Sequence, residues 1–160
     1  MKRVLIFLAV FFIFYLAISA LNRVKGDSGY VGTETCKGCH EDHYNRFVKS
    51  VHGKNAVPGS PANRDGCESC HGPGAEHVEK GGGRGVAIFV FDRKTDPDTK
   101  DSKCQACHGE RRDLPFWDLS RHKSGQISCD NCHSLHSSVP GKDYLKAAEP
   151  DLCFTCHRNI

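Results

Sequence analysis

All ten cysteines of this 160-residue chain lie in one repeated motif, Cys-x-x-Cys, and a histidine directly follows each pair. Five disulfides or zinc sites would also use paired cysteines, but neither needs a histidine after every pair. Cys-x-x-Cys-His is the attachment signature of c-type haem, in which two thiols bind the porphyrin covalently and the histidine binds the iron. The sequence therefore predicts five covalently bound haems. The motifs contain Cys36, Cys39 and His40; Cys67, Cys70 and His71; Cys104, Cys107 and His108; Cys129, Cys132 and His133; and Cys153, Cys156 and His157.

Five further histidines are available to bind the opposite face of each iron. The only methionine is Met1, so His/Met ligation, which raises the reduction potential, is not open to the rest of the chain. The count of five matches the five distal ligands that bis-histidine ligation of every haem would need, and we predict predominantly bis-histidine, low-spin iron. The alternative for each histidine is an ordinary surface residue, most of all for His43. The five candidates are His43, His52, His77, His122 and His136.

Spacing restricts which haem each of these histidines can serve. His43 follows His40 by three residues, and His136 follows His133 by three. On a helix such residues have Cβ atoms only about 5–6 Å apart, too close to hold a porphyrin between them. The apolar spacing after His43 predicts a helix that continues to a stop at Gly53, which also carries His52 away from His40. We therefore expect each motif's haem to be clamped by a histidine from another segment.

The predicted fold class follows from the shortage of apolar core residues, whose place the haems would take. The chain has 16 glycines, and many of its apolar residues lie in one N-terminal run, so the rest is poorly supplied with core residues. We predict mostly irregular coil with short α-helices wrapped around five closely packed haems, and little or no sheet. Residues 86–91 form one further apolar run. It is a short strand, a flap over a haem face, or a segment that contributes ordinary hydrophobic packing.

The N-terminus predicts export. Residues 4–21 are nearly continuous apolar sequence after Lys2 and Arg3, the layout of a signal peptide or a membrane anchor. We therefore divide the chain into residues 1–26, signal peptide or anchor, and 27–160, a pentahaem domain in the periplasm. Four of the 22 basic residues precede Asp27, and the remaining 18 face 19 acidic residues. No basic patch indicates nucleic-acid binding.

Four stretches resemble a known family: "GYVGTETCKGCHEDHYNRFVKSVHG", "GCESCHGPGAEHVEKGG", "WDLSRHKSGQISCDNCHSLH" and "DLCFTCHR". Together, over residues 29–158, they are similar to the pentahaem module of periplasmic multihaem c-type cytochromes. That module occurs in the electron donor to the periplasmic nitrite reductase and twice in decahaem cytochromes of outer-membrane conduits. The resemblance implies distal ligands at His52, His77, His122 and His136. The distal ligand of the last haem stays open: His43, a neighbouring subunit's histidine, or none.

The resemblance and the filled axial positions imply an electron carrier rather than an enzyme, because iron with two imidazoles cannot bind a substrate. The implied partners are an inner-membrane quinol dehydrogenase and an outer-membrane porin–cytochrome conduit or a periplasmic reductase, in anaerobic respiration. Residues 4–21 could also attach the protein to the membrane. The alternatives are a membrane-anchored quinol dehydrogenase, a filament of stacked haem subunits, or a nitrite or hydroxylamine reductase. The last would need a haem with an open face.

Overall fold

The computed structural model describes residues 29–109, 114, 116–136 and 143–158. The predicted export segment, residues 1–26, lies outside this part of the chain. None of the helices within it has the length and apolar character needed to cross a membrane. The helices are α2 (Thr33–Lys37), α3 (Glu41–Phe47), α4 (Glu68–His71), α5 (Ala75–Glu79), α6 (Pro97–His108), α7 (Arg121–Ser124), α8 (Cys129–Cys132) and α9 (Asp151–Phe154), with 3-10 turns η2 (Val51–Gly53), η3 (Pro61–Asn63) and η4 (Trp117–Leu119).

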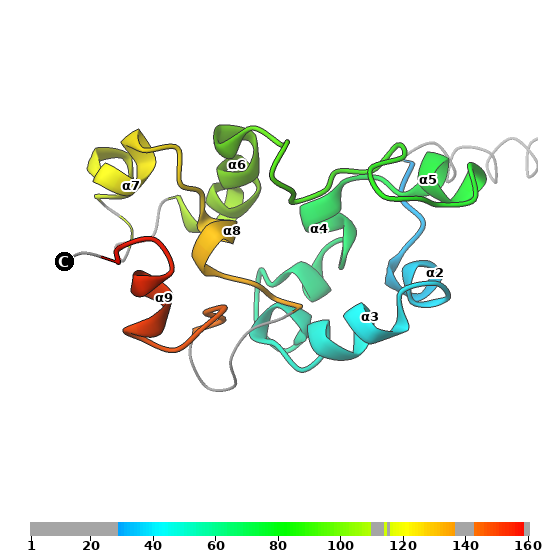
Figure 1. The fold of residues 1–160 in the computed structure, drawn as a ribbon. Coiled ribbons are helices and arrows are strands. Elements are labelled where there is room, and N and C mark those ends of the chain that lie inside the picture. Colours follow the sequence, from blue (N-terminus) through cyan, green and yellow to red (C-terminus); the bar gives the residue numbers. More distant parts are fainter. Residues whose placement is uncertain (1–28, 110–113, 115, 137–142, 159–160) are drawn as a thin grey trace, which may run out of the picture.

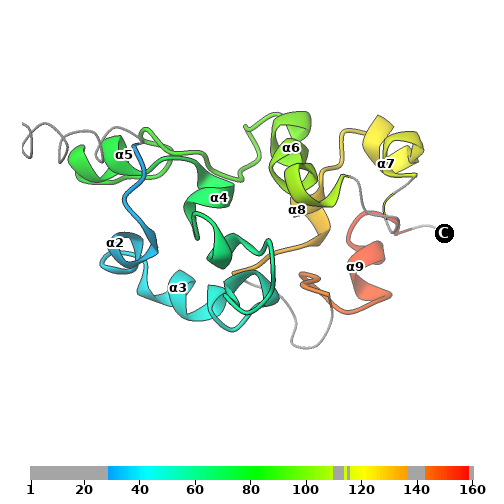
Figure 2. The same cartoon turned by 180° about the vertical axis from the view of Figure 1, so that it is seen from behind.

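Short helices joined by irregular segments make up this structure, as predicted. Helices α2 to α5 occupy one end of the molecule and α6 to α9 the other, with α4 facing α6 near the middle (Figures 1 and 2). In the described residues no strand forms, and one isolated bridge joins His133 to Leu145. The predicted fold class is confirmed at this level.

Helix α3 ends earlier than its apolar spacing predicts. The predicted helix ran to Gly53, but α3 stops at Phe47. The Ser50 hydroxyl donates to the Phe47 carbonyl at 2.7 Å and accepts from the Gly53 amide at 3.2 Å. A serine that bonds locally in this way competes with the helix ladder. The chain then turns back so closely that a Cβ at Gly53 would lie 2.1 Å from the Phe47 oxygen. The continuous helix was therefore wrong, and His52 sits on the turn η2.

The apolar run at residues 86–91 is irregular backbone, so the strand alternative was wrong. Its Phe89 amide donates to the His71 carbonyl at 3.1 Å. The Phe91 ring meets the His71 ring edge-on, with centroids 5.7 Å apart, and Phe89 packs against Phe91 at 4.9 Å. The run therefore covers the end of α4, where the second motif finishes.

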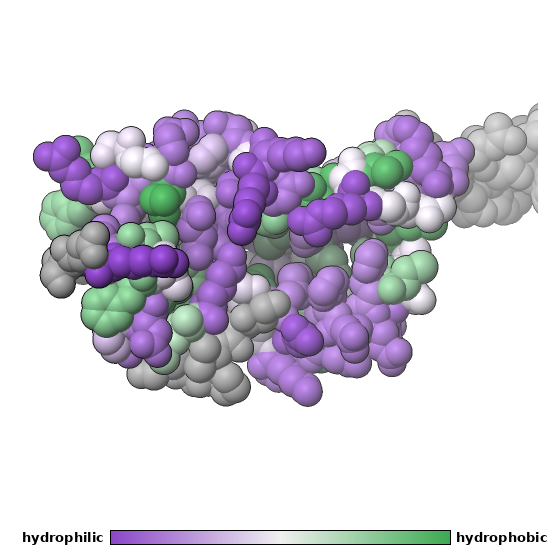
Figure 3. Space-filling model, in the orientation of Figure 1, coloured by the Kyte–Doolittle hydropathy of each residue, from purple (hydrophilic) through white to green (hydrophobic). Residues whose placement is uncertain are grey.

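Buried polar groups, rather than an apolar core, join the elements. Within the described residues Phe47 is the one apolar side chain that is buried. Glu68, which is 3% exposed, accepts from the amides of Val31 at 3.0 Å, Gly32 at 2.8 Å and Gly74 at 2.8 Å. This carboxylate ties the start of α2 to α4 and to the start of α5. The face in Figure 3 is correspondingly mostly hydrophilic, with separate apolar areas.

A second buried carboxylate organises the other end. Asp101 on α6 accepts from the Cys129 amide at 2.8 Å, the Trp117 indole at 3.1 Å and the Lys123 ammonium at 3.3 Å. Beside it, Lys100 pairs with Asp130 at 3.0 Å. Together these contacts hold α7, α8 and η4 against α6, because buried charges are stable only when they are paired or hydrogen-bonded.

Candidate haem-binding sites

Each Cys-x-x-Cys-His motif has a helical backbone, four of them as a short turn. The histidine amide donates to the carbonyl of the first cysteine at 2.9 Å in His40, 3.1 Å in His71, 2.9 Å in His133 and 2.9 Å in His157. The remaining motif ends α6 at His108. In a helical turn residues i, i+3 and i+4 share one face. Both thiols and the imidazole of each motif therefore face one side, which suits a porphyrin held by two thioethers and one axial nitrogen.

All ten cysteines are free thiols in the structure, so none of the five alternative disulfides forms. Consecutive motifs nevertheless bring thiols close together. Burial and the neighbouring Cys67 raise the pKa of Cys36 to about 11. Burial and the third motif's Cys104 and Cys107 raise the pKa of Cys70 to about 11. These contacts place the first motif beside the second and the second beside the third.

The same order continues to the C-terminus. A hydrogen bond between Cys104 and Cys129 lowers the pKa of the first thiol and raises that of the second. Burial, followed by the neighbouring Cys153 and Cys156, raises the pKa of Cys132. The five motifs are therefore spatial neighbours in the order in which they occur in the sequence.

Four of the motif histidines face a histidine from another segment. Their ring centroids are 6.3 Å apart for His40 and His77, 6.4 Å for His71 and His136, 6.0 Å for His108 and His52, and 6.1 Å for His157 and His122. A metal–imidazole bond is about 2 Å long, and the ring centre lies about 1 Å beyond the nitrogen, so two imidazoles on one iron have centroids about 6 Å apart. These four pairs have the separation that a shared iron requires.

His43 and His133 are the two histidines outside these pairs. The His43 ring lies 4.7 Å from that of His136, which is too close to share an iron. It also lies 6.0 Å from His40, but on the same stretch of backbone. His133 makes no ring contact with another histidine, and all ten histidines belong to the described residues. The sequence left open which histidine serves the last motif, and the structure places His122 6.1 Å from His157. Among the motif histidines, His133 is the one that faces no other histidine ring.

Backbone carbonyls orient three of the rings. The Nδ1 atoms of His71, His77 and His133 lie 2.9, 2.8 and 2.9 Å from the carbonyl oxygens of Phe89, Val86 and Asp143. A carbonyl only accepts, so each Nδ1 carries the proton and leaves the Nε2 lone pair available. Metal-binding histidines are commonly held in this way. Sequence reasoning did not identify these carbonyls, because any residue type can supply one.

Burial also keeps several rings neutral. It lowers the pKa of His52 and of His71, and together with the neighbouring His43 and His71 it lowers the pKa of His136 to about 4. Only a neutral imidazole can donate its lone pair to a metal. These three rings are therefore in the form that binds iron at neutral pH.

Comparison with known proteins gives two matches. Residues 122–160 match a family described as the doubled CXXCH motif. Over 137 residues, 83% of its length, the chain is 29% identical to a protein named multiheme cytochrome MtrA from Shewanella baltica (strain OS185). The chain spans only 40% of that relative. No solved structure matches the chain.

Proposed function

We propose that this chain, which carries a multihaem c-type cytochrome module, relays electrons along five covalently bound haems. The observation that carries the proposal is the spatial order of the motifs. The Cys67 amide of the second motif donates to Thr33 at the start of α2 at 3.4 Å, α4 contacts α6, and the Cys129 amide donates to Asp101 on α6 at 2.8 Å. The thiols follow the same order, from Cys36 beside Cys67 to Cys132 beside Cys153. Haems attached at these thiols would form a continuous series from one end of the molecule to the other.

The ligand set supports transfer rather than catalysis. Four irons take the pairs His40–His77, His71–His136, His108–His52 and His157–His122, whose separations suit a shared metal. His43 is assigned to the haem of His133 by count alone. Bound haem supplies one-electron chemistry; the chain's residues fix its position, fill its axial sites and exclude substrates from the iron.

The proposed location is the periplasm. Its support is the apolar run at residues 4–21 behind Lys2 and Arg3, whether this segment is removed or kept as an anchor. The haem domain, residues 27–160, exchanges electrons with an inner-membrane quinol dehydrogenase and with an outer-membrane porin–cytochrome conduit or a periplasmic reductase.

Absorption spectra with carbon monoxide and cyanide test the ligand set. The wild-type holoprotein should be low-spin in both oxidation states and unchanged by either ligand, because every iron has two imidazoles. His77→Ala should create one high-spin haem that binds carbon monoxide, at the His40 motif. Lys80→Ala is the matched control, since Lys80 follows the same helix and pairs with Glu76 at the surface.

Two results would contradict this function. Ligand binding by the wild-type protein would show an open iron and favour a reductase. An unchanged spectrum in His77→Ala would remove His77 from the ligand set and, with it, the pairing to His40.

A further inference from the structure

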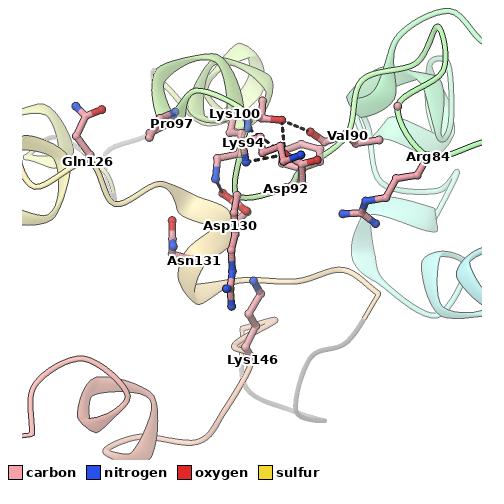
Figure 4. A pocket seen from close by; sticks show the side chains of 14 residues that line it. Arg84, Val90, Asp92, Lys94, Pro97, Lys100, Gln126, Asp130, Asn131 and Lys146 are labelled. Carbon is pink, nitrogen blue, oxygen red and sulfur yellow. Dashed lines mark hydrogen bonds and ion pairs between the residues drawn. The ribbon is translucent and has the colours of Figure 1, made fainter.

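An open cleft of about 960 Å³ lies between the segment 84–97, α6, α8 and Lys146. Figure 4 shows that side chains from all four regions surround it, with Arg84 and Lys146 reaching toward it from different sides. Neither a cysteine nor a histidine lines it. The cleft is therefore distinct from the faces on which the motif thiols and imidazoles lie.

The cleft is strongly basic. Five cations line it, against the two carboxylates Asp92 and Asp130. Lys100 is neutralised by Asp130 at 3.0 Å. Asp92 is occupied in a tight turn, where it accepts from the amides of residues 94 and 95 at 2.9 and 3.0 Å. The other four cations form no ion pair with a described residue: Arg84, Arg93, Lys94 and Lys146.

The cleft borders the second haem site. Phe91 lines the cleft and also packs edge-on against the His71 ring at 5.7 Å. Lys146 donates its amide to the Cys132 carbonyl at 2.9 Å, beside the segment that leads to His136. Asp130 and Asn131 also line the cleft; they are the two central residues of the fourth motif, on the side of its turn away from the thiols. The cleft thus adjoins the His71–His136 pair, and through Lys146 it also touches the fourth motif.

We propose that this cleft is a carboxylate-binding site, and that its occupants are the propionates of the haem attached at Cys67 and Cys70. The inference rests on the proposed function, because it requires a haem between His71 and His136. Haem carries two carboxylates opposite its thioether edge, and unpaired arginine and lysine side chains are the groups that bind carboxylates. The four cations that form no ion pair with a described residue therefore hold and neutralise these carboxylates.

The cleft then sets the redox behaviour of one haem. Reduction lowers the charge of the iron by one, so nearby cations stabilise the reduced form and raise its reduction potential. Replacing one of these cations with a neutral residue should favour the oxidised form of this haem and lower its reduction potential. Lys146 also lies beside the fourth motif, where its amide donates to the Cys132 carbonyl at 2.9 Å, so the fourth haem should respond to Lys146 as well. The remaining three haems should change little.

Redox titration of the holoprotein, followed by absorption and electron paramagnetic resonance, tests the proposal. We expect Lys146→Gln with Arg84→Gln to lower the potential of the haem at His71 by about tenfold in the equilibrium constant, about 59 mV for one electron. Lys146→Arg keeps the positive charge, so the potential of this haem should stay at its wild-type value. Lys54→Gln, which removes an exposed cation outside the cleft, is the control. Both mutated side chains are on exposed residues, so folding should be retained.

The His136→Ala background identifies the haem. There the haem at His71 should gain a high-spin band, and Lys146→Gln should shift the midpoint of that band. Unchanged potentials, or an equal shift in Lys54→Gln, would overturn the proposal. So would calorimetric binding of inorganic phosphate that is lost in the cleft variants while all potentials stay fixed, since the site would then serve a soluble anion. Haem count and spin state, measured first, show separately whether the electron-transfer function holds.

Discussion

Glu68 is a motif residue whose role is structural. It stands between Cys67 and Cys70, yet its carboxylate is buried and accepts three backbone amides from the segments that begin α2 and α5. It therefore fixes the first two haem motifs relative to each other. The sequence did not reveal this structural role, because an acidic residue between the two cysteines of a motif is expected to be exposed to solvent.

Glu68→Gln should destabilise the holoprotein by about 2 kcal/mol, because an amide offers one acceptor oxygen and turns an N–H₂ toward the remaining amides. Chemical unfolding followed by far-UV circular dichroism measures the loss. Glu76→Gln serves as the control: Glu76 is exposed and pairs only with Lys80 one turn away, so its stability should stay near that of the wild type. Equal effects in both variants would argue against the three-amide role.

The histidines show how far sequence reasoning reaches at this scale. The spacing of His40 and His43 predicted that neighbours in sequence would not share a haem, which stays a prediction; the structure places rings from different segments side by side. Which ring meets which depends on turns such as the one at Ser50, so the pairing of His108 with His52 could not be read from the chain.

At the scale of elements, caps matter because the helices are too short to be stable alone. The longest, α6, begins at Asp96, whose carboxylate accepts from the Thr99 amide and hydroxyl, both at 2.8 Å. Pro97 follows at the first helical position, where it is favoured. This N-terminus was not predicted, because the cap lies within a polar stretch that resembles a linker. The Asp96-Pro97 pair, a capping residue followed by proline, was the feature of the sequence that indicates a helix start here.

Asp96→Ala should lower the midpoint of thermal unfolding by a few degrees at pH 7, through loss of the cap. The hydrogen bonds from Thr99 lower the pKa of Asp96 below its usual value. Its contribution is therefore fully present above the unfolded-state pKa of about 3.9 and disappears as the pH falls through the lower folded-state value. Calorimetry at pH 7 and pH 3 should show a difference between wild type and variant that shrinks in acid. Asp118→Ala, at an exposed position, should show no such pattern; a difference independent of pH would contradict the assignment.

At the scale of the whole molecule, the main physical fact is how few apolar side chains are buried in the part of the chain that the structure describes. Within the described residues only Phe47 is a buried apolar side chain, while Phe116 is 73% and Leu119 is 83% exposed. Composition predicted this general character, since glycine-rich sequence cannot bury much apolar surface. The order of the motifs along the molecule could not be predicted, because it depends on long-range contacts such as those of Asp101 with Cys129 and Lys123.

Because Phe47 is the one buried apolar side chain among the described residues, the chain should not fold without its haems. Conformational entropy opposes folding by about 1–2 kcal/mol per residue, and one buried phenylalanine with a few buried carboxylates cannot offset it. Protein made in cells that lack cytochrome maturation should therefore show little helical circular dichroism and rapid proteolysis. The same chain matured with haem should resist the protease and carry the mass of five haem groups. A cooperative thermal transition in the haem-free chain would mean that the buried polar network, centred on Glu68 and Asp101, can hold the fold by itself.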